Sequence, residues 1–245
     1  MEFMDKTAIV TGAAAGIGRA TVAQLVRGGA NVVMVDMNEE KLTALQAELA
    51  EFGDKLMAVS CDVSDEEAVN QAVAAANARF GQVDILVNCA GIWRDVAPFQ
   101  QASSDLWRKY LDINVMGTVH FTKAVLDPML QQGYGRIINV ASVAGVYGNA
   151  KMSFYSATKG AVIAMTKALA KEVTGQGVTV NAVSPGSVSP AENLDIDYTQ
   201  PSELSFAGRT GSCRENADLI CFLASEKAGY ISGQNIQIDG CRKKQ

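Results

Sequence analysis

TAIVTGAAAGIG, residues 7–18, is a short apolar run that breaks at once into a glycine-rich turn. A helical pattern follows as far as Gly28, and a second apolar run, residues 32–35, ends in Asp36. Glycine allows a tight turn without a Cβ clash, and the free N–H groups at the start of a helix attract a pyrophosphate. A carboxylate at the tip of the second strand can accept both hydroxyls of an adenosine ribose. The stretch therefore predicts a dinucleotide-binding strand, turn, helix and strand.

The glycine spacing leaves alternatives open. It is G-x-x-x-G-x-G rather than the G-x-G-x-x-G of many dinucleotide sites, and a purely structural turn would give the same pattern. A phosphate-binding P-loop is excluded because Arg19-Ala20, not Lys-Ser or Lys-Thr, follows the glycines.

Apolar and amphipathic stretches alternate along all 245 residues. This alternation predicts an α/β fold, a single-domain Rossmann-type doubly wound seven-stranded parallel sheet with helices on both faces. The predicted strands are residues 7–10, 32–35, 56–61, 83–87, 136–140, 178–183 and 235–238. The predicted helices after the first are residues 38–52, 64–79, 104–132, 153–174 and 214–225, the second of these opened by a Ser64–Glu67 capping box.

We expect one domain, residues 1–245, with a substrate-binding lid at 187–212, where helical and strand periodicity is lost. The polar and glycine breaks follow the predicted strands. Because ligands bind beyond the carboxyl ends of parallel strands, these breaks predict one shared cleft.

Composition narrows the class of protein. A net charge of −5 argues against nucleic acid and anionic membranes as partners. No apolar signal segment or bilayer-spanning run is visible, and the five cysteines form no Cys-x-x-Cys pair, so we expect a cytoplasmic protein with free thiols. With His120 as the single histidine, we predict no metal site and interpret His120 as a packing residue.

Proton chemistry is predicted on the helix at 153–174. Tyr155 and Lys159 are one turn apart and share a face. A free tyrosine has a pKa of about 10, which a neighbouring ammonium is expected to lower. Ser142 leaves the preceding strand toward the same cleft, where its hydroxyl could bind a carbonyl or alkoxide oxygen.

These motifs together resemble the classical short-chain dehydrogenase/reductase family over nearly the whole chain. The matching motifs are T-G-x-x-x-G-I-G, the asparagine-alanine-glycine turn at 88–91 with Cys89 in place of an asparagine, and Ser142 followed by Tyr155-x-x-x-Lys159. The resemblance implies hydride transfer between a nicotinamide and a secondary alcohol or ketone. The apolar, aromatic character of the expected substrate contacts, such as Trp93 and Tyr147, suits a cyclic or hydroxysteroid-like alcohol.

The resemblance also implies residue roles. The catalytic residues it implies are Asn114, Ser142, Tyr155 and Lys159. The cofactor-binding residues it implies are Gly12, Ala15, Gly16, Ile17, Gly18, Asp36, Met37, Asp62, Val63, Asn88, Ala90, Gly91, Tyr155, Lys159, Pro185, Gly186 and Val188. The expected substrate contacts are Ser142, Trp93, Tyr147 and Tyr198.

The expected cofactor is NAD. Asp36 would repel a 2′-phosphate, Met37 and Asn38 offer no positive charge, and Ala15 stands where NADPH-preferring relatives often carry a basic residue. Two departures from the family pattern are Pro190 in place of a threonine near the nicotinamide and Cys241 in place of a glycine.

Two other functions compete with this one. A 3-oxoacyl-thioester reductase of fatty acid synthesis shares the motifs, but residues 131–133 lack positive charge, and the predicted lid carries Glu192, Asp195, Asp197 and Glu203, which would repel an acidic carrier protein. A non-catalytic nucleotide sensor would not need the complete set of acid–base residues. The resemblance further implies a homotetramer, or a dimer.

Overall fold

The computed structural model describes residues 2–190, 194 and 198–243 and contains one seven-stranded sheet. All its strand pairs are parallel, which confirms the predicted fold class. In spatial order the strands are β3 (Leu56–Ser60), β2 (Asn31–Asp36), β1 (Thr7–Thr11), β4 (Ile85–Asn88), β5 (Gly135–Val140), β6 (Val178–Pro185) and β9 (Asn235–Ile238).

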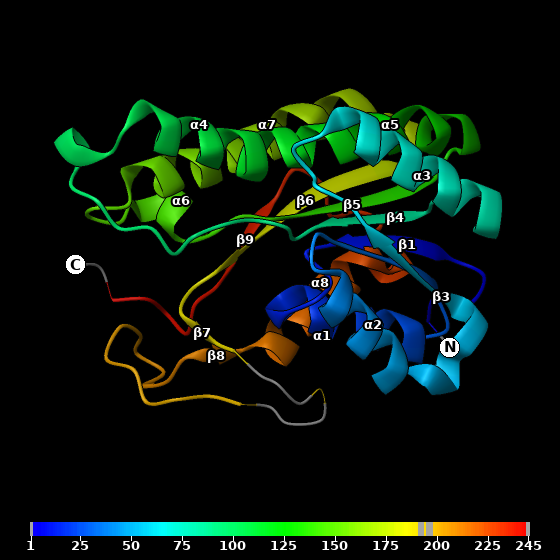
Figure 1. The fold of residues 1–245 in the computed structure, drawn as a ribbon, viewed down its shortest axis with the longest axis horizontal. Helices are drawn as coiled ribbons and strands as arrows, with labels where there is room; N and C mark the ends of the chain where they lie inside the picture. Colours follow the sequence, from blue (N-terminus) through cyan, green and yellow to red (C-terminus); the bar gives the residue numbers. More distant parts are fainter. Residues whose placement is uncertain (1, 191–193, 195–197, 244–245) are drawn as a thin grey trace.

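Helices cover both faces of the sheet (Figure 1). One layer holds α1 (Gly16–Arg27), α2 (Glu39–Glu48) and α8 (Cys213–Ala224). The other holds α3 (Glu66–Phe80), α4 (Ser104–Leu111), α5 (Gly117–Gln132) and α7 (Ser153–Val173). Each layer packs its apolar residues against one face of the sheet, so the central strands are buried on both sides and appear as continuous apolar runs.

Shorter elements connect these layers. They are η1 (Ala50–Lys55), η2 (Phe99–Gln101), α6 (Ala144–Tyr147), η4 (Thr174–Gln176) and η5 (Glu226–Ala228). The predicted helix at 38–52 therefore ends at Glu48, and its last residues form a 3₁₀ helix.

The predicted continuous helix at 104–132 is wrong in its middle. A π-helical turn, η3 (Asp112–Met116), separates α4 from α5 and contains the buried Asn114. The Thr118 hydroxyl donates to the Asn114 carbonyl at 3.2 Å. Such π turns inside helices occur frequently at functional sites.

The predicted Ser64–Glu67 capping box is also wrong. The N-cap of α3 is Asp65, whose carboxylate accepts from the backbone N–H groups of Glu67 at 2.9 Å and Ala68 at 3.1 Å. Ser64 is engaged elsewhere, because its hydroxyl donates to Asp62 at 2.7 Å. A capping box does open α8, between Ser212 and Glu215.

The segment predicted as a lid contains β7 (Val188–Ser189) paired with β8 (Gly211–Ser212). Residues near the end of the chain fasten its outer loop: the Phe206 N–H donates to the Cys241 carbonyl and the Lys243 N–H to the Leu204 carbonyl, both at 2.9 Å. Of the acidic residues expected in this segment, Glu192, Asp195 and Asp197 lie outside the described residues.

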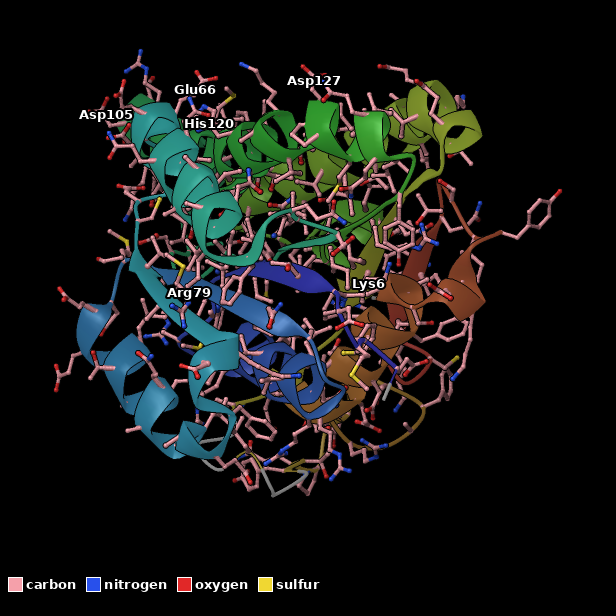
Figure 2. All side chains as sticks on the ribbon, turned by 90° about the vertical axis from the view of Figure 1, so that its right-hand side faces the viewer. Lys6, Glu66, Arg79, Asp105, His120 and Asp127 are labelled. Carbon is pink, nitrogen blue, oxygen red and sulfur yellow. The ribbon has the colours of Figure 1, made fainter. Side chains whose placement is uncertain are left out.

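His120 lies on α5 facing α3 (Figure 2). Its side chain is buried, and Nδ1 is 3.0 Å from the Val63 carbonyl oxygen. This confirms its interpretation as a packing residue. None of the helices in the described part of the chain is long and apolar enough to cross a membrane.

The contact between α6 and α7 generates a prediction about stability. A Cβ at Gly145 would lie 2.5 Å from the Lys159 carbonyl carbon, so Gly145→Ala should force α6 away from α7 and lower the free energy of unfolding by about 1–3 kcal/mol. At Gly160, on the facing helix, the nearest atom to a Cβ would be 3.5 Å away. Gly160→Ala is therefore the control and should be neutral or stabilising by up to about 1 kcal/mol. Urea unfolding of both variants checks this; equal midpoints would contradict it.

Candidate active site

The glycine turn after β1 lies directly against the turn after β4. Gly12 has φ +65°, and a Cβ there would approach the Ala90 Cα to 2.9 Å. The Thr11 hydroxyl oxygen accepts from the N–H groups of Cys89 and Ala90, both at 3.0 Å. Helix α1 begins after Ala15 with no side-chain cap and no acidic residue in its first turn. The first N–H groups of α1 therefore face the glycine turn, and no carboxylate in the first helical turn competes for them. An anionic ligand requires such free N–H groups.

Asp36 ends β2 beside the same turn. One carboxylate oxygen accepts from the Ala14 N–H at 3.1 Å and the other from the Asn38 N–H at 3.0 Å. These bonds hold the carboxylate at the carboxyl edge of the sheet. The nearby cation Arg19 is paired with Glu48 of α2.

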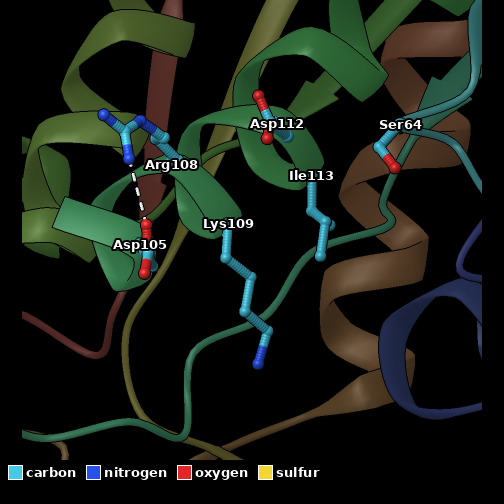
Figure 3. A pocket seen from close by; sticks show the side chains of 6 residues that line it. All are labelled: Ser64, Asp105, Arg108, Lys109, Asp112 and Ile113. Atoms are coloured by element: carbon cyan, nitrogen blue, oxygen red, sulfur yellow. Dashed lines mark hydrogen bonds and ion pairs between the residues drawn. The ribbon is translucent and has the colours of Figure 1, made fainter. Parts of the chain in front are cut away.

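The turn after β3 borders an open groove of about 380 Å³ (Figure 3). Its lining includes Ser64, which follows Asp62 and Val63, and Ile113 of the π turn. The side chain of Val63 points at α5, since a Cβ at Gly117 would lie 2.5 Å from its Cγ2. Ile113 was not predicted as a site residue, because a continuous helix gave no reason to single it out.

The turn after β4 has two different parts. The Asn88 amide is buried in the sheet and donates to Asn139 at 2.9 Å and to Thr122 at 3.2 Å, so this side chain has a structural role. Gly91 is different. A Cβ there would lie 3.1 Å from Asn114 Oδ1 and 3.4 Å from Lys159 Nζ, so the space beside these two polar groups depends on glycine.

The four predicted catalytic residues converge. Lys159 Nζ donates to the Val140 carbonyl at 2.7 Å, two residues before Ser142. Ser142 lies close enough to Tyr155 to act on the pKa of its phenol, which it lowers. Asn114 accepts from the Ile92 N–H at 2.8 Å and donates to Thr158 at 3.2 Å, which ties the π turn to both the β4 turn and α7.

The turn after β6 completes the carboxyl edge. The Pro185 carbonyl accepts from the Val143 N–H at 3.1 Å, and a Cβ at Gly186 would lie 2.9 Å from the Asp239 Cα. Val188 pairs with Gly211 in the small two-stranded sheet. This turn therefore lies next to Ser142 and the predicted lid.

The predicted substrate residues are less closely grouped. Trp93, Tyr147 and Tyr198 are all partly exposed, and the Tyr198 hydroxyl accepts from the Gln200 amide at 2.7 Å. Met37 and Ala15 are exposed beside the glycine turn.

Comparison with known proteins matches this architecture to a family. Residues 6–199 match the family described as short chain dehydrogenase. This chain belongs to the short-chain dehydrogenase family. It is 37% identical to 3beta-hydroxysteroid dehydrogenase 2 of Eggerthella lenta, over 96% of this chain and 94% of that protein. It is also 37% identical to 3-oxoacyl-[acyl-carrier-protein] reductase FabG of Thermotoga maritima, over 98% of both chains. The crystal structure of NAD+-bound xylitol dehydrogenase superimposes with a TM-score of 0.90 at 34% identity, covering 98% of this chain and 100% of that one.

In this short-chain dehydrogenase, burial controls the acidity of the central residues. Burial raises the pKa of Tyr155; Ser142 opposes that rise, and Cys89 adds to it. The expected lowering by Lys159 is therefore wrong here. Burial of the phenol is the largest effect on it, and burial also lowers the pKa of Lys159 from 10.5 to about 8.

The buried lysine generates a prediction about pH. Between about pH 8 and 10.5 the unfolded chain holds more protons on Lys159 than the folded chain does, so the free energy of unfolding should rise with pH through this window. Lys159→Met should lose this rise. The urea unfolding midpoints of the wild-type protein and Lys159→Met, measured from pH 7 to 10.5, check this. Groups that titrate in both proteins cancel when one curve is subtracted from the other. Parallel curves would show that Lys159 does not titrate in this range.

Proposed function

We propose that this short-chain dehydrogenase uses NAD(H) to interconvert a secondary alcohol and a ketone, with Tyr155 as the general acid–base. The observation that carries the proposal is that Lys159 Nζ lies beside Gly91 and bonds to the Val140 carbonyl, two residues before Ser142, while Ser142 in turn acts on Tyr155. Related proteins in the family are dehydrogenases and reductases of alcohol and ketone groups, as their names state.

The residues at the carboxyl edge fit a dinucleotide. The uncapped start of α1 would hold the pyrophosphate, and Asp36 the adenosine ribose. Asp62 and the backbone of Val63, in the turn after β3, would contact the adenine. Lys159 would bind the second ribose through the open space at Gly91, and the turn at Pro185 and Gly186 would border the nicotinamide. When bound, the nicotinamide supplies or accepts the hydride.

The protein's own contribution is positioning and proton transfer. Ser142 would donate a hydrogen bond to the substrate oxygen, which stabilises negative charge on that atom in the transition state. Tyr155 would donate its phenolic proton to this oxygen during reduction and accept it during oxidation. Asn114 is a positioning residue, because its bonds to Ile92 and Thr158 fix the two segments that flank Lys159.

Cofactor choice follows from charge. The Asp36 carboxylate is held beside the turn by the N–H groups of Ala14 and Asn38, where it would repel a 2′-phosphate. Arg19, which could otherwise neutralise that phosphate, is paired with Glu48. These contacts support NAD(H) over NADP(H).

The surroundings of the site favour an apolar, cyclic or hydroxysteroid-like substrate. Trp93, Val96 and Phe99 are exposed on the segment that follows the β4 turn, and Tyr147 is exposed at the end of α6. These side chains are the substrate-recognition surface that we propose, with residues 187–212 as a lid. We further propose a homotetramer acting in the cytoplasm on small molecules.

The alternative function is reduction of a 3-oxoacyl thioester, favoured by the relative in Thermotoga maritima. Docking of an acidic carrier requires positive charge around the entrance. Glu203 of the proposed lid adds negative charge instead, and residues 131–133, at the other end of β5, carry no positive charge. This charge distribution supports a free alcohol or ketone instead.

Removing the phenol tests the proposed function directly. Tyr155→Phe should lower kcat by at least about 100-fold, since it deletes the proton that is transferred, while NADH affinity measured by fluorescence stays within about twofold. Tyr134→Phe, at the opposite edge of the sheet, is the control and should keep full activity. The assay should use steroid, polyol, cyclic-ketone and acyl-thioester substrates. An active Tyr155→Phe enzyme would remove Tyr155 from its proposed role.

Changing Asp36 tests the cofactor. Asp36→Ala should weaken NADH binding about tenfold and narrow the preference over NADPH by at least about tenfold, because ribose hydrogen bonds are lost together with the repulsion. Glu40→Ala, an exposed acidic residue in the first turn of α2, is the charge-matched control. If the ratio of the NADPH and NADH dissociation constants is the same in Asp36→Ala as in the wild-type protein, the role of Asp36 in cofactor choice is refuted.

A further inference from the structure

Tyr110 of α4 joins two parts of the site that the reaction itself does not explain. Its side chain is fully buried, yet its hydroxyl reaches the segment after β4. That hydroxyl donates to an Asp95 carboxylate oxygen at 3.0 Å and accepts from the Asp95 backbone N–H at 3.1 Å. Residues 91–98, which carry Trp93, are therefore bonded to α4 through this one phenol.

The ring of Tyr110 packs against the residue proposed to transfer the proton. Its centroid lies 6.4 Å from that of Tyr155, with the rings at 82°, an edge-to-face arrangement. The same ring contacts Phe154 at 4.6 Å. Two consecutive residues at the start of α7 are thus held by one buried aromatic side chain, in the edge-to-face geometry that aromatic pairs prefer.

We propose that Tyr110 and Asp95 form a positioning pair that couples the substrate-recognition segment, residues 91–98, to the orientation of the Tyr155 ring. The inference rests on the proposed function, in which Tyr155 transfers the proton and Trp93 contacts substrate. Substrate that orders the segment would also fix Asp95, then the Tyr110 ring, and through it the phenol at the reacting atom. Tyr110 transfers no proton itself and acts through the Tyr155 ring, so its role is indirect.

The charges around the pair suit this role. Burial raises the pKa of Tyr110 to about 12, so the phenol stays protonated and keeps its bond to Asp95 at the pH where the enzyme works. The groups that face Tyr155 are Ser142, Cys89 and Tyr110. Tyr110 connects the Tyr155 ring to residues 91–98 through Asp95, whereas the chain of bonds from Ile92 through Asn114 and Thr158 reaches the Tyr155 backbone carbonyl.

Variants of Tyr110 and Asp95 separate the effect of the Tyr110–Asp95 hydrogen bond from the effect of the Tyr110 ring. Tyr110→Phe keeps the ring and removes the bond to Asp95; it should raise KM about tenfold and leave kcat and its pH profile unchanged. Asp95→Ala should do the same, and the double variant should be no worse than either single one, because both remove one interaction. Tyr110→Leu also removes the ring; it should lower kcat about 10–100-fold and shift the limb of the pH profile that reports Tyr155.

Phe121→Leu is the matched control, because it trims an equally buried aromatic residue on α5. It should lower the unfolding midpoint without moving the pH profile. The positioning pair is refuted if Tyr110→Leu lowers the unfolding midpoint without moving the pH profile, as Phe121→Leu should. It is also refuted if Tyr110→Phe and Asp95→Ala keep the wild-type KM. This second test does not need Tyr110→Leu to fold. Retained activity in Tyr155→Phe would instead refute the proposed function, so the two failures are distinguishable.

Discussion

A buried ammonium is the constraint on which the site depends. Lys159 is almost completely enclosed, and its Nζ donates to the Val140 carbonyl at 2.7 Å. Burying a charge without partners is strongly unfavourable, so the surrounding backbone must supply oxygen atoms and leave room for a polar ligand. The glycine at 91 and the π turn at Asn114 provide this room and the nearby amide. Substitutions at Gly91 or Asn114 would therefore alter the surroundings of the Lys159 ammonium directly.

The parallel sheet explains why these residues meet at all. Asp36, Asn88, Val140 and Pro185 end or nearly end strands that run in one direction, so their following turns lie along one edge. Helix α7 then returns across the sheet and brings Tyr155 and Lys159 to the turn after β5, on the side where α6 and β7 also lie (Figure 1). Residues far apart in sequence are thereby brought together by the sheet, and the cysteines in the described part of the chain form no disulfide.

Much of this could be predicted from the sequence because the information is local. The apolar runs fixed the strands, and the spacing of Tyr155 and Lys159 on one helix face required only helix geometry. The errors came from competition between near-equal local contacts. Ser64 and Asp65 are both good helix caps, and the bond from Ser64 to Asp62 decides between them. The π turn at 112–116 has no simple sequence pattern, since it depends on where Asn114 finds partners across the fold. The direction of the Tyr155 pKa shift needed burial, which a sequence does not give directly.

The fastening of residues 204–207 by residues 240–243 has a mechanical consequence. The Phe206 and Ala207 N–H groups both donate to carbonyls of that later segment, and Gly240 directly follows Asp239, which packs on Gly186. Displacement of the outer loop must therefore either break these bonds or carry with it the strand extension beyond β9. In the second case the loop does not swing as a free flap, and its travel is limited by the stiffness of the sheet's edge strand.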